Sequence, residues 1–143
     1  ACRLCLVEIG KNGNSDLEPS CQTEVAEDME VTTRSERIEE RRTIIFELLL
    51  ATAPESKELE EMAAEHGVTE TRFDLNSEGK CMLCGLCVRV CAEVVGMEAI
   101  SFSDRGVGRR VKTPFGKISD SCIGCGACAY ICPTDAIEVE EAT

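Results

Sequence analysis

Two stretches decide the fold of the C-terminal half: Cys81-Met-Leu-Cys-Gly-Leu-Cys-Val-Arg-Val-Cys91 and Cys122-Ile-Gly-Cys-Gly-Ala-Cys-Ala-Tyr-Ile-Cys132. In each run, two residues separate the first three Cys and three residues precede the fourth. A [4Fe–4S] cube needs four thiolates arranged tetrahedrally around it. Two-residue gaps let three successive thiolates wrap one side of the cube, so each run indicates one iron–sulfur cluster.

The fourth thiolate of each cluster is expected to come from the other run, because in two-cluster ferredoxins the last Cys of a run binds the neighbouring cluster. The sequence therefore predicts one [4Fe–4S] cluster held by Cys81, Cys84, Cys87 and Cys132. It predicts a second held by Cys122, Cys125, Cys128 and Cys91. Gly85 and Gly126 follow the second Cys of each run, where the lack of a Cβ lets backbone N–H groups point toward sulfide.

The composition agrees with a metal-binding protein. Eleven of the 143 residues are Cys, and an odd number argues against a closed disulfide framework. Structural zinc normally uses two separated Cys-x2-Cys pairs, which these repeated four-Cys runs do not match. The net charge of −12 argues against a nucleic-acid partner. Without a signal peptide or long apolar stretch, we expect a cytoplasmic protein with no direct membrane span.

The order of elements predicts an α+β chain in three parts. Residues 1–34 alternate as strands do around Leu6 and Met29. Residues 35–78 have helical periodicity, predicting a helical hairpin. Thr33 with Glu36 is expected to begin it as a capping box, Pro54 to lie in the first turn of its second helix, and Gly67 to end it. Residues 79–143 contain the two Cys runs, and a β-hairpin insertion is expected between Ile100 and Ile118.

The first part contains a sparser group of thiols: Cys2, Cys5 and, after fifteen intervening residues, Cys21. Three thiolates are one short of the four that a [2Fe–2S] cluster needs. The sequence opens at Ala1 in what reads as the middle of a domain, so we expect an earlier segment to carry the fourth ligand. On these residues alone, a set of reduced thiols or a zinc knuckle stays an open alternative.

These motifs resemble the N-terminal region of the large Fe–S subunit of complex I. The resemblance rests on Cys2-Arg-Leu-Cys-Leu-Val-Glu, Pro19-Ser-Cys-Gln-Thr-Glu-Val, Arg41-Arg-Thr-Ile-Ile-Phe-Glu-Leu-Leu-Leu and both four-Cys runs. The small diaphorase subunit of NAD-reducing hydrogenases and the front of [FeFe]-hydrogenases and some formate dehydrogenases share this module. The resemblance implies a partial β-grasp-like [2Fe–2S] ferredoxin domain over 1–34, with Cys2, Cys5 and Cys21 as ligands. It also implies a bacterial-type 2[4Fe–4S] ferredoxin domain over 79–143.

One departure from the family lies in residues 35–78. The family binds a further [4Fe–4S] cluster there through one His and three Cys. Here Ala53 stands at the His position, and no Cys lies between Cys21 and Cys81. The only His, His66, is expected at a helix C-terminus, where it suits the helix dipole. We therefore predict that the His-ligated cluster is absent and that 35–78 is a helical linker.

The resemblance implies an electron-relay subunit of a multi-subunit NAD(P)-linked oxidoreductase. Its expected partners are a flavin and NAD(P)-binding subunit and a catalytic or acceptor redox subunit, so the assembly would be a hetero-oligomer. The chain itself is expected to make or break no bonds, since clusters carry the redox chemistry. The relay part of a larger [FeFe]-hydrogenase or formate dehydrogenase polypeptide and a free ferredoxin carrier are the alternatives.

Overall fold

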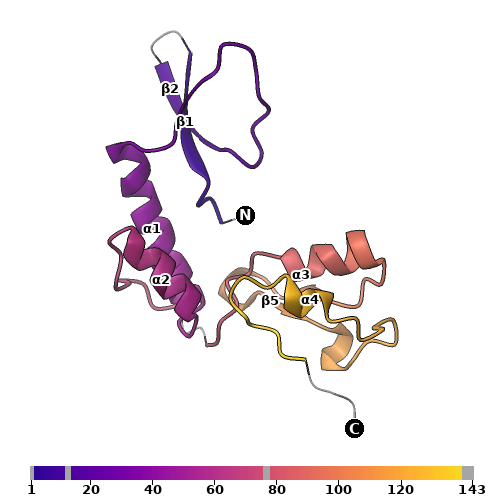
Figure 1. Cartoon of the computed structure of the whole chain (residues 1–143). Coiled ribbons are helices and arrows are strands. Elements are labelled where there is room, and N and C mark those ends of the chain that lie inside the picture. Colours follow the sequence, from indigo (N-terminus) through magenta and orange to yellow (C-terminus); the bar gives the residue numbers. More distant parts are fainter. Residues whose placement is uncertain (1, 12–13, 76–77, 140–143) are drawn as a thin grey trace.

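The computed structural model describes residues 2–11, 14–75 and 78–139. Figure 1 shows a small sheet at one end, a pair of helices next to it, and a C-terminal region of short helices and turns. Of the helices in the described ranges, none is long and apolar enough to cross a membrane.

The N-terminal sheet has three antiparallel strands in the order β2-β1-β3. They are β1 (Leu6–Lys11), β2 (Asn14–Pro19) and β3 (Glu30–Thr32). Leu6 of β1 lies opposite Pro19, and Ile9 lies opposite Val31 of β3. The sequence predicted β1 and β3 but not β2, whose polar composition shows no alternation. The β-grasp-like arrangement stays a prediction, since three strands alone do not define it.

Two helices form the middle of the chain, α1 (Glu36–Thr52) and α2 (Lys57–Glu65). The expected cap at Thr33 is wrong, because Ser35 is the N-cap of α1 and its hydroxyl accepts a hydrogen bond from the Ile38 N–H at 3.2 Å. Pro54 does not start α2 either. The N-cap of α2 is Ser56, whose hydroxyl accepts from the Leu59 N–H at 3.2 Å.

The predicted stop at Gly67 is confirmed. Gly67 has a φ of +75°, which a residue without Cβ adopts at little cost. Its N–H donates to the Ala64 carbonyl at 2.9 Å, and the Val68 N–H donates to the Ala63 carbonyl at 3.0 Å. This pair of bonds is the Schellman motif. It turns the chain so that Val68 is buried against the helices.

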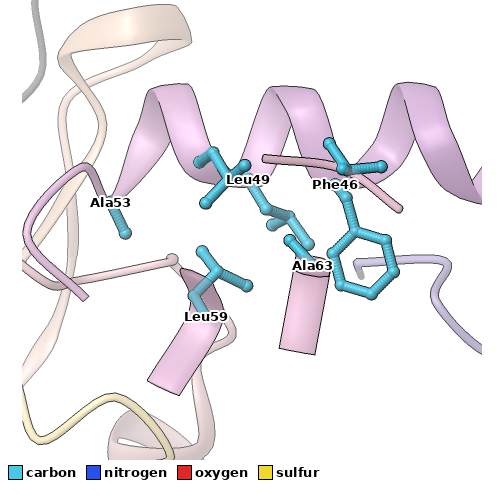
Figure 2. Packing of buried hydrophobic residues seen from close by; sticks show 7 residues of the cluster. Phe46, Leu49, Ala53, Leu59 and Ala63 are labelled. Atoms are coloured by element: carbon cyan, nitrogen blue, oxygen red, sulfur yellow. The ribbon is translucent and has the colours of Figure 1, made fainter. Parts of the chain in front are cut away.

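An apolar core fills the space between α1 and α2 (Figure 2). It consists of Phe46, Leu49, Leu50, Ala53, Leu59, Ala63 and Val68. The face that α2 turns to α1 follows helical spacing, since Leu59 and Ala63 lie four residues apart. Leu4 from the N-terminal region and Met82 from the first Cys run pack on the edge of this core. The helical pair therefore touches the loops on both sides of it.

The C-terminal region is built from short elements. Helix α3 (Leu86–Arg89) continues into the π-helix η1 (Val90–Val95), and α4 (Ala127–Tyr130) lies within the second Cys run. Between them, β4 (Ser101–Ser103) pairs antiparallel with β5 (Arg110–Lys112), which gives the predicted hairpin. The 3₁₀ turn η2 (Gly106–Gly108) lies between the two strands. A second 3₁₀ turn, η3 (Pro114–Gly116), follows β5.

Candidate iron–sulfur sites

The first four predicted thiols line one small cavity of about 120 Å³. Cys81, Cys84 and Cys87 come from the loop before α3 and the start of that helix, and Cys132 comes from just after α4. Cys87 is buried, and this burial raises the pKa of its thiol. Binding to iron requires the thiolate. The fold thus gathers donors from both runs around one space, as the crosswise assignment requires.

The other four thiols line a second and wider cavity of about 470 Å³. They are Cys91, Cys122, Cys125 and Cys128. Cys91 lies on η1, and Cys128 lies on α4. The remaining wall is mostly apolar and includes Ile118 and Ile123, both exposed. The two cavities therefore differ in size, although the Cys spacing around them is identical.

The internal repeat of the sequence is also a repeat of backbone conformation. Gly85 and Gly126 have φ values of +79° and +71° and immediately precede α3 and α4. One position before the second Cys, Leu83 and Gly124 are also left-handed, with φ values of +56° and +68°. Left-handed residues on both sides of the second Cys curl each loop around its cavity. Leu83 does this with a Cβ present, which costs about 1–2 kcal/mol.

Each fourth Cys accepts a backbone hydrogen bond at its sulfur. The Ala99 N–H donates to the Cys91 sulfur at 3.3 Å, and the Ala136 N–H donates to the Cys132 sulfur at 3.2 Å. Each donor follows a left-handed acidic residue, Glu98 in the first case and Asp135 in the second. N–H groups that donate to cluster sulfurs help to set the reduction potential. The Ala that follows each run, Ala99 or Ala136, thus contacts the last Cys of that run through its backbone.

The donor set fits a [4Fe–4S] cube at both places. Each cavity has four thiols on its wall, drawn three from one run and one from the other. Among the described residues, no three or more His, Cys, Asp or Glu side chains gather as the ligands of one metal ion would. The thiols surround a space instead, and in a cube each thiolate binds a separate iron.

Gly85 gives a direct test of the first site. A Cβ built there lies 2.9 Å from Cζ of the Phe102 ring and 3.1 Å from Cε2. Gly85→Ala is therefore expected to combine left-handed strain with a clash, and to lower the iron content of the purified protein. The matched control is Gly126→Ala, which has the same strain but nothing within 4 Å of the new Cβ. The clash with Phe102 is not the cause if both variants lose iron equally. It is also not the cause if adding Phe102→Ala to Gly85→Ala fails to restore the iron content.

The three N-terminal thiols lie near the surface: Cys2 and Cys21 are exposed and Cys5 is half-buried. The Cys5 and Cys21 sulfur atoms share a hydrogen bond at 3.3 Å. The Cys21 N–H lowers the pKa of Cys5, and the hydrogen bond between the two side chains raises the pKa of Cys21. Two donors of the predicted [2Fe–2S] site are thus already side by side. The exposed Cys2 thiol takes no part in this hydrogen bond.

Arg42 ties α1 to the backbone on either side of Cys5. Its guanidinium donates to the Leu4 carbonyl at 3.3 Å and to the Leu6 carbonyl at 3.0 Å. The same side chain forms an ion pair with Glu39 at 3.0 Å, and Glu39 also contacts His66 Nδ1 at 3.1 Å. The hydrogen bond to His66 holds the pKa of Glu39 below its usual value, with the charge of Arg42 adding to the effect. His66 lies at the C-cap of α2 as predicted.

Replacing Arg42 should loosen the loop that carries Cys5. Arg42→Met keeps most of the aliphatic bulk but removes both donors, each worth about 1.5–3 kcal/mol for a charged group. We expect the electron paramagnetic resonance (EPR) signal of the reduced [2Fe–2S] cluster to fall several-fold while the [4Fe–4S] signals stay. Arg41→Met is the control, because Arg41 is exposed next to it on α1. An unchanged [2Fe–2S] signal in Arg42→Met would show that the loop holds its shape without these bonds.

At the position where the resemblance expects the family's cluster-binding His, this chain has Ala53. Ala53 is fully buried in the core between α1 and α2, beside Leu49 and Leu59 (Figure 2). His66 is turned to Glu39 and to the Phe46 ring, with 4.9 Å between ring centroids. The described residues 36–75 contain no Cys, and their one imidazole contacts Glu39. The absence of the His-ligated cluster stays a prediction, which rests on the missing Cys residues, whereas no sequence signal points to the Arg42 contacts.

Comparison with known proteins agrees with both parts of this description. Residues 80–141 match a family described as a 4Fe-4S dicluster domain, and residues 1–36 match a 2Fe-2S iron-sulfur cluster binding domain. The chain is 32% identical to an NADH-quinone oxidoreductase subunit of Rhizobium meliloti over 96% of its length. It is 30% identical over 99% of its length to subunit HndD of the NADP-reducing hydrogenase of Solidesulfovibrio fructosivorans. These matches span 19% and 28% of the two relatives.

A solved structure is similar along nearly the whole chain. A chain of an NAD+-reducing [NiFe]-hydrogenase in the H2-reduced state superimposes with a TM-score of 0.76 and 28% identity, covering 94% of this chain and 67% of that one. The fold and the gathered thiols define an iron–sulfur protein with 2Fe-2S and 4Fe-4S ferredoxin-type domains. These similarities agree with the resemblance to the large Fe–S subunit of complex I that the sequence motifs indicate.

Proposed function

We propose that this chain relays single electrons within an NAD(P)-linked oxidoreductase. The observation that carries the proposal is the gathering of eight thiols into two sets of four around separate cavities. Two [4Fe–4S] clusters there, and one [2Fe–2S] cluster at Cys2, Cys5, Cys21 and a fourth ligand from an earlier segment, would each accept and release one electron. The protein's own residues hold the thiolates in place, donate N–H groups to sulfur and limit the access of water.

The proposed partners are a flavin and NAD(P)-binding subunit and a catalytic or acceptor redox subunit. The two relatives are named as subunits of NAD(P)-linked enzymes, which supports a hetero-oligomer. In this arrangement, residues 1–34 and 79–143 would be the two cluster-binding domains and 35–78 the linker between them. The packing of Leu4 and Met82 on the helical core supports the linker role, because one unit touches both cluster loops.

A second candidate places the same relay at the front of a larger catalytic polypeptide. It is supported by the length of the relatives, of which the chain spans 19% and 28%. The mass of the native protein decides between the two. A native protein that runs alone as a monomer of the size of this chain would contradict both and leave the free carrier.

The test of the relay is EPR of the anaerobically purified, dithionite-reduced protein, together with iron and sulfide analysis. We expect two [4Fe–4S] signals, one [2Fe–2S] signal and about ten irons per chain. About eight irons would remove the N-terminal cluster from the proposal, and about fourteen would restore the His-ligated cluster. Protein that holds iron but is not reduced by dithionite contradicts a role in electron transfer.

A further inference from the structure

The hairpin insertion differs in charge from the rest of the chain. We call residues 101–118 the hairpin arm. It carries five Arg or Lys residues and a single Asp, whereas residues 1–78 carry eight basic and nineteen acidic residues. The basic side chains are all exposed and are Arg105, Arg109, Arg110, Lys112 and Lys117. The arm is thus a local positive region on a strongly acidic protein.

Most of this positive charge is not neutralised within the described part of the chain. Lys112 forms an ion pair with Asp104 at 3.7 Å. Arg109 stacks instead on the Phe102 ring, with its guanidinium carbon 3.9 Å from the centroid, and Arg110 donates to the Gly108 carbonyl at 3.2 Å. The contacts of Arg109 and Arg110 hold two charges in place without cancelling them. Such fixed and uncompensated charges can direct the approach of an oppositely charged partner.

The arm also exposes large apolar side chains. Phe115 is fully exposed, and Val107 and Ile118 are 76% and 86% exposed. Phe115 has a φ of +56°, a conformation that is an outlier for a bulky residue and marks strain. In the free chain, burial compensates neither the exposure of these apolar side chains to water nor the backbone strain of Phe115. Apolar anchors within a ring of charge are typical of the surfaces on which proteins dock.

The arm is in contact with both cluster cavities. Val111 of β5 lines the cavity of Cys81, and Thr113 and Ile118 line the wider cavity of Cys122. A protein docked on the arm would therefore lie beside a place where electrons can leave or enter.

We propose that the hairpin arm is the docking surface for an acidic one-electron carrier protein, which exchanges electrons with the C-terminal cluster sites. This inference rests on the proposed relay and names the chemistry of one of its partners. The observations behind it are the excess positive charge, the exposed apolar anchors and the position of the arm beside both cavities. One electron passes between the two proteins, with one oxidised as the other is reduced, and no bond is formed or broken.

The test measures electron transfer by stopped flow at low ionic strength. The intact, anaerobically purified protein is mixed with a plant-type [2Fe–2S] ferredoxin as the acidic probe, or with cytochrome c as the basic one. Arg105→Glu with Lys117→Glu reverses two charges whose side chains make no hydrogen bond or ion pair within the described residues. We expect this variant to react on the order of tenfold more slowly with the ferredoxin. Added salt should reduce the difference.

The matched control reverses two exposed charges on the acidic part of the chain, Arg34→Glu with Lys57→Glu. It should leave the ferredoxin rate within about twofold of the parent, because those charges lie outside the arm. A second variant, Phe115→Gly, relieves backbone strain and should raise the melting temperature while lowering the ferredoxin rate. Cytochrome c should be unaffected by the arm variants, or react faster with them.

Several results would overturn the inference. Equal loss of rate in the arm and control variants would mean that only net charge matters. Binding of a labelled DNA duplex at physiological salt, or a homodimer on a sizing column, that the arm variant abolishes would assign the surface to nucleic acid or to a second copy. If dithionite reduces the clusters but the arm variant keeps its ferredoxin rate, this inference fails and the relay stands. Clusters that dithionite does not reduce would instead contradict the relay itself.

Discussion

Cys91→Ser is expected to destroy the cluster of the second Cys run and to leave that of its own run in place. Cys91 belongs to the same run as Cys87, but it lines the cavity of Cys122, Cys125 and Cys128. A [4Fe–4S] cube that loses one of its four thiolates is poorly held, and a serine hydroxyl does not replace a thiolate well. We expect iron to fall by about four per chain and one of the two [4Fe–4S] signals to disappear.

The reciprocal variant is the control for Cys91→Ser. Cys132→Ser should remove the other cluster, because Cys132 lines the small cavity with Cys81 and Cys84. The two clusters can be told apart by their potentials, which differ when solvent access and N–H bonds to sulfur differ. The crosswise assignment is wrong if Cys91→Ser and Cys81→Ser remove the same signal. It is supported if Cys91→Ser and Cys122→Ser do so.

Phe46→Ala should be the most destabilising substitution in the helical part of the chain. The Phe46 ring is 2% exposed, lies in the core and packs against His66. Removing a buried Phe leaves a cavity and typically costs about 3–5 kcal/mol. That is a large fraction of the stability of an ordinary domain, which is about 5–15 kcal/mol. The measurement is the urea midpoint followed by helical circular dichroism.

The chain contains its own control for this loss. Phe115→Ala removes the same ring from a fully exposed position, so it should change the free energy of unfolding by less than about 0.5 kcal/mol. Similar midpoints for the two variants would mean that Phe46 does not hold the helices together. A loss in Phe46→Ala that disappears in the iron-free protein would mean that the clusters, and not the core, stabilise the helical part.

The strongest sequence signals concerned local chemistry. The two four-Cys runs, combined with the crosswise pattern of two-cluster ferredoxins, predicted which thiols line each cavity. Gly67 was a reliable signal for the end of α2, because a glycine directly after an amphipathic helical stretch commonly adopts the left-handed conformation that ends a helix. The β4–β5 hairpin was expected from the stretch 100–118, although the turn that joins its strands lies at Gly106–Gly108. In each case, a few neighbouring residues determine the outcome.

Longer-range features were beyond the sequence. Strand β2 carries Asp16 and Pro19 with no alternation, so only its pairing with β1 makes it a strand; the Asn12-Gly13 pair was the available hint. Thr33 and Ser35 are both chemically able to cap α1, and the choice places Ile38 in a fully buried position. Arg42 contacts Leu6, which lies 36 positions earlier in the chain, and Leu4, which lies 38 positions earlier. No local pattern predicts such pairs, because the tertiary fold creates them.

The apolar core between α1 and α2 has a consequence for how the protein matures. Leu4 and Met82 pack on this core, and each is the immediate neighbour of a proposed ligand, Cys5 or Cys81. Leu4 and Met82 are held by apolar side-chain contacts, and none of the core residues is a proposed metal ligand. The helical part can therefore pack without a bound cofactor. It would then present both flanking loops, already oriented, to the machinery that inserts iron and sulfide.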